Sequence, residues 1–326
     1  MLVIVAPGQG AQVPGFLSPW LELPGVAGQF AAWSEVVGLD LARYGTTADA
    51  DEIRDTAVAQ PLLVGAGMVS ASAILGPLVS PSPGLPAEAS LVDAVAGHSV
   101  GEFTAAAIAG VLSPKDALTL VAERGRGMAD AAARTETGMT AVLGGDREQV
   151  LEAIAAAGLT PANDNGSGQI VAAGTVEQLA AFAQNPPERA RLRPLSVAGA
   201  FHTEHMAPAV ERARQAAAVL SPSDPSVRIL SNADGAVVES GSEYLDRLIS
   251  QISSPVRWDA CTETLAELGV TALIELTPAG TLTGLAKRAL RGVELLAVKT
   301  PEDIDRAAAL IKEHAGTSAA GTDQEG

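Results

Sequence analysis

The sequence predicts an α/β fold built around a mainly parallel β-sheet. Short, mostly apolar runs occur at residues 2–6, 91–96, 227–230 and 271–276, and each is followed by a turn rich in small residues. Such runs are typical of strands that are buried on both faces of a parallel sheet. Long alanine-rich segments of helical character separate them, as in the crossovers between parallel strands. Ligands of such a sheet bind beyond the carboxyl ends of its strands, where these turns gather.

A different order of elements interrupts this sheet: strand, helix, strand, strand, helix, strand. This is the order of a split βαβ module of the ferredoxin-like type. The six elements are expected at residues 138–144, 147–157, 159–163, 169–173, 176–183 and 191–197. We therefore expect a large α/β domain (1–133 and 199–314), a small inserted ferredoxin-like α+β subdomain (134–198), and a flexible tail (315–326) of small and polar residues.

Composition limits the classes of partner and the compartment. The 38 acidic side chains outnumber the 21 basic ones and give a net charge of −17. Nucleic acid and anionic membrane surfaces both require a basic face, so neither is expected as a partner. The longest weakly polar run, residues 64–79, is too short to span a membrane, and the N-terminus lacks the features of a signal peptide. Cys261 is the single cysteine and cannot form an internal disulfide, so we expect a cytoplasmic protein.

A candidate nucleophile lies between the run 91–96 and a helix expected at 101–110. The segment Gly97-His98-Ser99-Val100-Gly101 matches G-x-S-x-G, in which the serine sits on a sharp turn and the glycines allow close packing on either side. The start of the following helix offers backbone N–H groups to a developing oxyanion. We predict that Ser99 is a nucleophile; the alternative is an ordinary strand-to-helix turn.

A nucleophilic serine needs a base, and the chain has four histidines. His98 is the sequence neighbour of Ser99, and adjacent residues at a strand end point to opposite sides, so we expect His98 to be a packing or hydrogen-bonding residue. His314 lies in the last turn of a terminal helix, where a cation is favoured by the helix dipole. His202 and His205 follow the last strand of the insert. We prefer His202 because it lies at a loop-to-helix junction and can point into a cleft between the domains.

A helix expected at residues 114–133, with Ser113 as its N-cap, carries a cation on its apolar face. Arg124 falls on the same stripe as Val121 and Met128. A guanidinium on a buried face needs an anion, because an unpaired buried charge is costly. That anion is either a core carboxylate in a structural salt bridge or the carboxylate of a substrate, and position alone does not separate the two.

Seven short motifs occur along the chain. They are Gly8-Gln9-Gly10-Ala11-Gln12, Gln60-Pro61-Leu62, Gly97-His98-Ser99-Val100-Gly101-Glu102, Glu123-Arg124-Gly125, Gly199-Ala200-Phe201-His202, Ser254-Pro255-Val256 and Gly280-Thr281-Leu282-Thr283-Gly284-Leu285. In this order and spacing they resemble the motifs of the malonyl-CoA:acyl-carrier-protein transacylases of fatty acid synthesis, which are close to the acyltransferase domains of polyketide synthases. The resemblance reaches to about residue 300. It implies a hydrolase-like α/β domain with a ferredoxin-like insert.

The resemblance also implies roles for particular residues. Ser99 matches the family's nucleophile, His202 its base, and Arg124 the residue that binds the malonyl carboxylate. The backbone N–H groups of Gln9 and Val100 match the oxyanion hole.

Four further residues match the family's site. Gln251 matches the residue whose backbone carbonyl orients the histidine, although several neighbouring carbonyls could serve. Asn163 and Asn165 match asparagines near the acyl pocket. Phe201 matches the malonyl-selective form of its motif, in which an aromatic ring fills the space that an α-methyl group would need; one methyl group is worth only about 1–3 kcal/mol of discrimination.

The activity implied is ping-pong transfer of a malonyl group from malonyl-CoA to the phosphopantetheine thiol of acyl carrier protein, without a metal or other cofactor. A protein with net charge −17 needs local positive charge to dock two anionic partners, and Lys287, Arg288 and Arg291 form a candidate patch, unless they are simply a solvated helix face. A monomer is expected. The alternatives are an acyltransferase that loads polyketide carrier proteins, an esterase or thioesterase that pairs Ser99 with His314, and an inactive carrier-binding scaffold.

Overall fold

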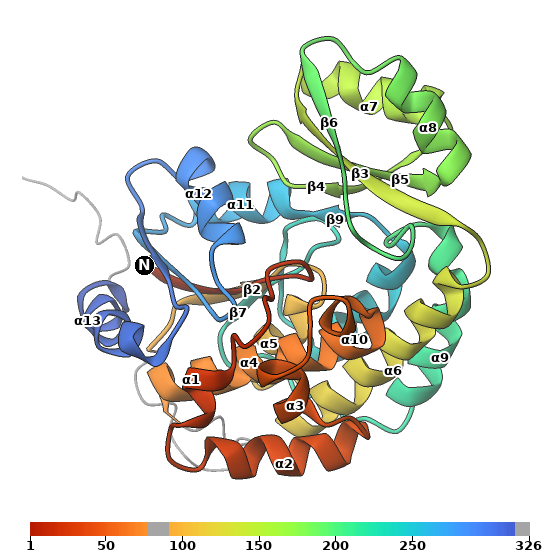
Figure 1. Cartoon of the computed structure of the whole chain (residues 1–326). Coiled ribbons are helices and arrows are strands. Elements are labelled where there is room, and N and C mark those ends of the chain that lie inside the picture. The colour runs from red at the N-terminus through yellow and green to blue at the C-terminus, as the bar shows by residue number, and fades with distance from the viewer. Residues whose placement is uncertain (77–90, 317–326) are drawn as a thin grey trace, which may run out of the picture.

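Two β-sheets organise the structure, a computed structural model that describes residues 1–76 and 91–316 (Figure 1). The larger sheet has the strand order β11-β10-β1-β2-β7-β8. Its strands are β1 (Leu2–Ala6), β2 (Ala94–Gly97), β7 (Arg228–Leu230), β8 (Val237–Val238), β10 (Ala272–Glu275) and β11 (Glu294–Ala297). The strands from β11 to β7 pair in parallel, and β8 is antiparallel to β7. The predicted mainly parallel α/β sheet is therefore confirmed.

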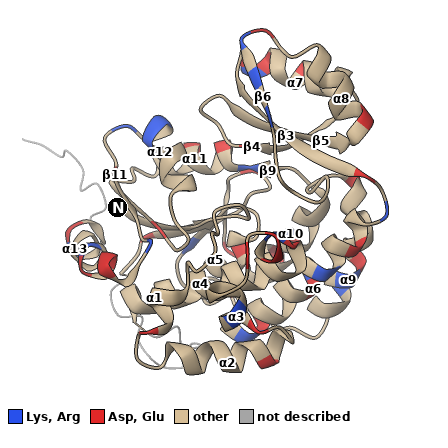
Figure 2. Cartoon of the chain, in the orientation of Figure 1, with Lys and Arg blue, Asp and Glu red and all other residues tan. Residues whose placement is uncertain are grey.

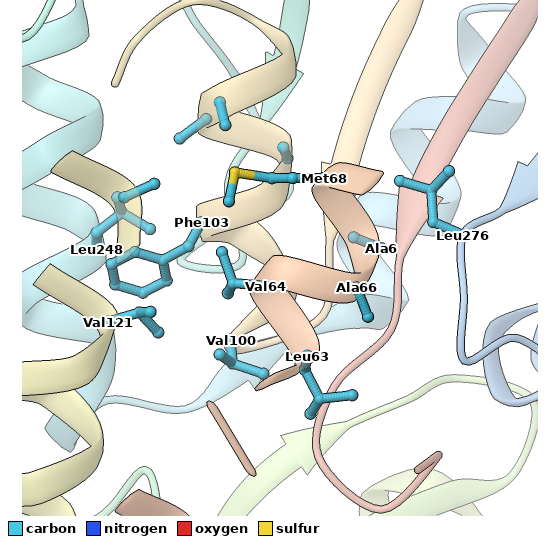
Figure 3. Close-up of a cluster of buried hydrophobic side chains, with 14 of the residues drawn as sticks. Ala6, Leu63, Val64, Ala66, Met68, Val100, Phe103, Val121, Leu248 and Leu276 are labelled. Carbon is cyan, nitrogen blue, oxygen red and sulfur yellow. The ribbon is translucent and has the colours of Figure 1, made fainter. Parts of the chain in front are cut away.

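The larger sheet is buried on both faces, which explains why its central strand is a continuous apolar run. Along β1, Leu2, Ile4 and Ala6 join one hydrophobic cluster, whereas Val3 and Val5 join another. The first cluster includes side chains of the helices α4 (Thr56–Leu75), α5 (Gly101–Ile108), α6 (Pro114–Ala132) and α10 (Gly241–Ser250), and Figure 3 shows part of it. The second includes side chains of α11 (Trp258–Glu267) and α12 (Thr281–Ala289).

The helices have the following bounds: α1 (Ser18–Leu21), α2 (Val26–Val37), α3 (Leu41–Thr46), α4 (Thr56–Leu75), α5 (Gly101–Ile108), α6 (Pro114–Ala132), α7 (Arg147–Ala156), α8 (Val176–Gln184), α9 (Ala207–Ala217), α10 (Gly241–Ser250), α11 (Trp258–Glu267), α12 (Thr281–Ala289) and α13 (Ile304–His314). Short 3₁₀ helices are η1 (Glu52–Arg54), η2 (Glu204–Met206), η3 (Gln251–Ser253) and η4 (Pro301–Asp303). As expected, the side chain of Ser113 caps α6 by accepting the backbone N–H of Asp116.

Several boundaries differ from the sequence expectation by one to three residues; the strand predicted at 191–197, for example, spans Ala190–Pro194. The strand predicted at 91–96 spans Ala94–Gly97. Leu91 is 46% exposed, and Asp93 contacts Leu2 at the start of the strand: its backbone N–H donates to the Leu2 carbonyl at 2.9 Å and its carboxylate accepts the Leu2 N–H at 2.7 Å. The helix predicted to reach residue 110 ends at Ile108, since Gly110 adopts a positive φ of 75°.

Helix α4 is long and apolar enough to cross a membrane by length and composition, but 78% of its most apolar window is buried inside the protein. The helix is longer than the part of the weakly polar run 64–79 that it contains, since it begins at Thr56 and continues through Pro61. Figure 3 shows its side chains Val64 and Met68 among other buried apolar side chains, so its hydrophobicity is that of a core helix. Residues 77–79 of the predicted apolar run lie outside the described residues.

The smaller sheet has the order β6-β3-β5-β4-β9. It contains β3 (Thr137–Gly144), β4 (Thr160–Asp164), β5 (Gln169–Thr175) and β6 (Ala190–Pro194), which with α7 and α8 follow the predicted ferredoxin-like order of elements. Its fifth strand, β9 (Val256–Arg257), comes from outside the insert and pairs in parallel with β4. This pairing joins the two parts of the chain directly beside the serine turn. The domain boundaries at 133/134 and 198/199 stay a prediction, and most of the predicted tail lies outside the described residues.

Candidate active site

Ser99 lies on a sharp turn between the end of β2 and the start of α5. Its φ is 51°, a left-handed conformation that is uncommon for a residue with a side chain. A Cβ atom on Gly97 would lie 2.0 Å from the carbonyl carbon of Gly101, and one on Gly101 would lie 2.2 Å from the carbonyl oxygen of Ala6. The two glycines are therefore required by close backbone packing, and the strained turn exposes the serine at the carboxyl edge of the sheet.

His202 is the histidine that contacts the serine. Its Nε2 lies 2.7 Å from Ser99 Oγ, and its Nδ1 lies 2.8 Å from the backbone carbonyl oxygen of Gln251. Nδ1–H can only donate to that carbonyl, which leaves the lone pair of Nε2 facing the hydroxyl. Burial, and next the positive charge of Arg124, lower the pKa of His202 to about 3, so the imidazole is neutral at physiological pH.

The other histidines lie elsewhere. His98 Nε2 is 2.8 Å from Oδ1 of Asn165, and its ring packs against Trp258. His205 lies in η2, and His314 lies at the end of α13, 2.9 Å from Oγ1 of Thr271.

Arg124 is 1% exposed and lies beside the serine. Its Nη2 donates to Ser99 Oγ at 3.2 Å and to Oε1 of Gln251 at 2.8 Å, and its Nη1 donates to Oε1 of Gln60 at 2.6 Å. Its partners are two amides and a hydroxyl. Within the described ranges it makes no salt bridge.

The charge state of Arg124 follows from this environment. Burial lowers its pKa to about 10, and Glu102 opposes the shift, so the guanidinium stays charged at neutral pH. A buried cation held by neutral groups can accept an anion.

A cavity of about 200 Å³ lies over these groups, between the two sheets. It brings together most of the residues singled out from the sequence: Gln9, Ser99, Val100, Arg124, Asn163, Asn165, Phe201 and His202. Gln251 is buried and contacts both Arg124 and His202. The smaller sheet contributes an apolar wall that includes Met139 and Val171.

Three residues of the site were not singled out as site residues by the sequence analysis. Asn232 accepts the backbone N–H of Ser99 through Oδ1 at 2.7 Å and donates to the carbonyl of Gly97 through Nδ2 at 2.8 Å, so it holds both sides of the turn. Gln60 accepts a hydrogen bond from Arg124 through Oε1, and Glu102 accepts one from the side chain of Gln251 through Oε2. The signal for Asn232 was its place in the turn after β7, at the same edge of the sheet as Ser99. The signal for Gln60 and Glu102 was their place in two of the seven motifs.

No group of three or more His, Cys, Asp or Glu side chains within the described residues could hold a metal ion. The expected lack of a cofactor stays a prediction.

Comparisons with known proteins agree with this geometry. The model of the acyl transferase domain family matches residues 3–321. The malonyl CoA-acyl carrier protein transacylase of Mycobacterium tuberculosis is 52% identical over 310 residues, which cover 95% of this chain and 100% of that protein. The Bacillus subtilis protein of the same name is 32% identical, over 96% of this chain and 98% of its own.

Solved structures give the same result. The crystal structure of the M. tuberculosis enzyme matches with a TM-score of 0.87 and 51% identity, over 94% of this chain and 99% of that chain. A malonyl-transacylase solved in complex with a type II polyketide synthase acyl-carrier protein matches with a TM-score of 0.83 and 29% identity, over the same shares of the two chains. This chain therefore belongs to the acyl transferase family, among the malonyl CoA-acyl carrier protein transacylases.

Proposed function

We propose that this chain transfers the malonyl group of malonyl-CoA to the phosphopantetheine thiol of acyl carrier protein through a malonyl ester of Ser99. The observation that carries the proposal is the buried Arg124 guanidinium, 3.2 Å from an Oγ that also faces the free lone pair of His202. A cation so close to a serine paired with a base suits an acyl group that ends in a carboxylate.

The first half-reaction acylates the serine. His202 Nε2 takes the hydroxyl proton of Ser99 while Oγ forms a bond to the thioester carbonyl carbon. The backbone N–H groups of Gln9 and Val100 donate to the resulting oxyanion. When the intermediate collapses, the carbon–sulfur bond breaks, and the coenzyme A thiolate takes the proton from the imidazolium of His202.

The second half-reaction runs these steps in reverse. The phosphopantetheine thiol gives its proton to His202, its sulfur attacks the malonyl ester, and Ser99 leaves with the proton returned from His202. Throughout, Arg124 holds the malonyl carboxylate and fixes the reacting carbonyl in one pose.

In this arrangement, binding of malonyl-CoA makes His202 a stronger base. Burial is the main cause of the low pKa of His202, and the charge of Arg124 is the second. A malonyl carboxylate paired with Arg124 offsets that charge, so the pKa of His202 rises when the substrate binds, and proton transfer from Ser99 becomes easier.

The experiment that tests the function mixes the protein with malonyl-CoA and a carrier protein bearing its phosphopantetheine arm, and follows the mass of the carrier. We expect malonyl addition, and none on a carrier that lacks the arm. Steady release of free malonate without addition to the carrier would contradict the proposal and favour a hydrolase. The hydrolase hypothesis requires His314 to act on Ser99. His314 lies on α13 beside Thr271, whereas His202 contacts Ser99.

We expect the Arg124→Met variant to lose malonyl transfer selectively. Its kcat/KM for malonyl-CoA should fall about 100-fold or more, because a buried charge-assisted pair with the substrate is lost. Acetyl-CoA has no terminal carboxylate, so its use should change far less. Rates with both acyl donors measure this, and an equal loss for the two would argue that Arg124 has only a structural role.

The second candidate function is the same chemistry with a polyketide carrier protein. The observation that favours it is the structural match to a malonyl-transacylase in complex with a type II polyketide synthase carrier protein. The two functions are separated by the ratio of kcat/KM values for a fatty acid and a polyketide carrier. We propose that either reaction takes place in the cytoplasm and that the active protein is a monomer.

A basic patch on α12 is proposed as the docking site for the carrier and coenzyme A. Lys287, Arg288 and Arg291 are exposed, and Figure 2 shows their charge on α12 and the turn after it. Thr281 and Leu282, in the first turn of the same helix, line the cavity over the serine. The patch lies at the other end of this helix and in the turn after it, and local positive charge there would offset the overall negative charge.

Reversing the charge of the patch tests this assignment. The triple variant Lys287→Glu, Arg288→Glu, Arg291→Glu should raise the KM for the carrier about tenfold with little change in kcat, because charges at a rim act mainly on association. Arg214→Glu on α9 is the matched control and should leave KM unchanged. A carrier KM that stays the same in the triple variant would exclude the patch.

A further inference from the structure

Glu102 is a buried carboxyl group that the reaction steps above leave unused. It follows Gly101 at the start of α5 and is 1% exposed. Its Oε1 accepts the backbone N–H of Asn232 at 2.6 Å, and its Oε2 accepts Nε2 of Gln251. Burial raises its pKa to about 8, with the Asn232 N–H and then the charge of Arg124 acting in the opposite direction. Each oxygen thus faces an N–H donor at the rear of the site.

Gln251 connects this carboxyl group to the reacting side chains. Its side-chain Oε1 accepts from Arg124 at 2.8 Å, while its backbone carbonyl lies 2.8 Å from Nδ1 of His202. Its Nε2 points to Glu102 and lies 3.2 Å from the carbonyl oxygen of Ser99. One residue therefore holds the arginine with its side chain and the histidine with its backbone.

Arg124 and Glu102 together fix the orientation of the Gln251 side-chain amide. Arg124 has only donors, and each oxygen of Glu102 accepts an N–H group, one from Asn232 and one from Gln251. The amide oxygen of Gln251 therefore faces Arg124 and its amide nitrogen faces Glu102. The other acceptors of this amide nitrogen are more distant, the carbonyl oxygen of Ser99 at 3.2 Å and Oδ1 of Asn232 at 3.3 Å, so Glu102 is its principal acceptor.

We propose that Glu102 is a positioning residue for the substrate-carboxylate site: by accepting the Gln251 amide N–H, it turns the amide oxygen onto Arg124 and aims the guanidinium at Ser99. This inference rests on the proposed malonyl transfer. The intervening amide matters because a carboxylate in direct contact with Arg124 would occupy the donors that the malonyl group needs. Glu102 acts through Gln251 and leaves those donors available.

The Glu102→Gln variant tests the proposal at nearly constant volume. The two N–H donors approach different oxygens of Glu102. A glutamine side chain presents one oxygen and one N–H₂ group to them, so one donor loses its acceptor and meets another donor. The backbone carbonyl of Gln251 still orients His202. We expect kcat/KM for malonyl-CoA to fall about 10- to 100-fold through misplacement of Arg124, and that for acetyl-CoA to change by less than about threefold.

Glu275→Gln is the matched control, since it also alters a fully buried carboxylate. Glu275 accepts the backbone N–H groups of Gly280, Leu282 and Thr283 and so caps α12, which lines the cavity but does not contact Arg124. Its substitution should change the use of the two acyl donors by the same factor. Thermal unfolding of each variant reports its folding separately.

The Gln251→Met variant is a second test. It removes the amide that connects Glu102 to Arg124 and keeps the backbone carbonyl that contacts His202. It should lower the malonyl-to-acetyl ratio of kcat/KM as Glu102→Gln does, and the double variant should show no further loss beyond the larger single effect. If Glu102→Gln does not fold, Gln251→Met still tests the link on which the proposal depends, because an unchanged malonyl-to-acetyl ratio in that variant would overturn it.

An unchanged malonyl-to-acetyl ratio in Glu102→Gln or Gln251→Met, an equal loss for both donors, or additive losses in the double variant would each overturn the proposal. A ratio that falls to the same extent in Glu275→Gln would also overturn it, because the effect would then be general. Failure of the wild-type protein to transfer malonyl at all would instead count against the proposed function.

Discussion

The Ser99→Ala variant should form no malonyl adduct under conditions in which the wild-type protein is acylated, with a loss of at least about 10⁴-fold in rate. Ser99 Oγ faces both Nε2 of His202 and the guanidinium of Arg124, so its removal deletes the one atom on which the acyl group is carried. Incubation with malonyl-CoA alone, an acid quench and intact mass spectrometry measure the result.

His314→Ala is the matched control for this experiment. That histidine lies on α13, bonded to Thr271, and its removal should leave adduct formation normal. An adduct on Ser99→Ala would mean that another residue is acylated. Loss of the adduct in His314→Ala would support the hydrolase hypothesis, in which His314 is the base for Ser99.

The His202→Ala variant should acylate about 10²- to 10⁴-fold more slowly than the wild-type protein, the range typical of a lost general base. His202 Nε2 lies 2.7 Å from the serine, whereas His98 is bonded to Asn165 and cannot replace it. Rapid-quench measurement of the malonyl adduct gives the rate. A loss of less than about threefold would exclude His202 as the base.

The pH dependence provides a second test of the same residue. A base works only when deprotonated, and its acid limb in kcat/KM lies at the pKa of the free protein. Burial and the charge of Arg124 lower the pKa of His202 to about 3, so acylation should be independent of this group between about pH 5 and 7. An acid limb near 6.5, the value of an exposed histidine, would show that the imidazole is not buried next to a cation.

Several elements could be predicted from the sequence because their causes are local. The apolar run at residues 2–6 can only be a strand covered on both faces, and it is the centre of the larger sheet. A serine directly before a helix, such as Ser113, caps it through a bond to the first turn, and Gly97 and Gly101 indicate a turn with close backbone packing. The start of β2 could not be predicted, because it depends on a bond between Asp93 and Leu2, which are far apart in the chain.

The pattern of the sequence by itself therefore determined the α/β class, the ferredoxin-like insert and the turn that carries Ser99. The tertiary structure alone decided whether Arg124 faces a structural carboxylate or neutral amides, which histidine reaches the serine, and which carbonyl orients that histidine. Glu102, and the side chain of Gln251, acquire their part in the site only there. The physical reason is that hydrogen bonds and charge pairs depend on distances of about 3 Å between side chains from separate elements, and these distances are set when the strand ends and helices pack together.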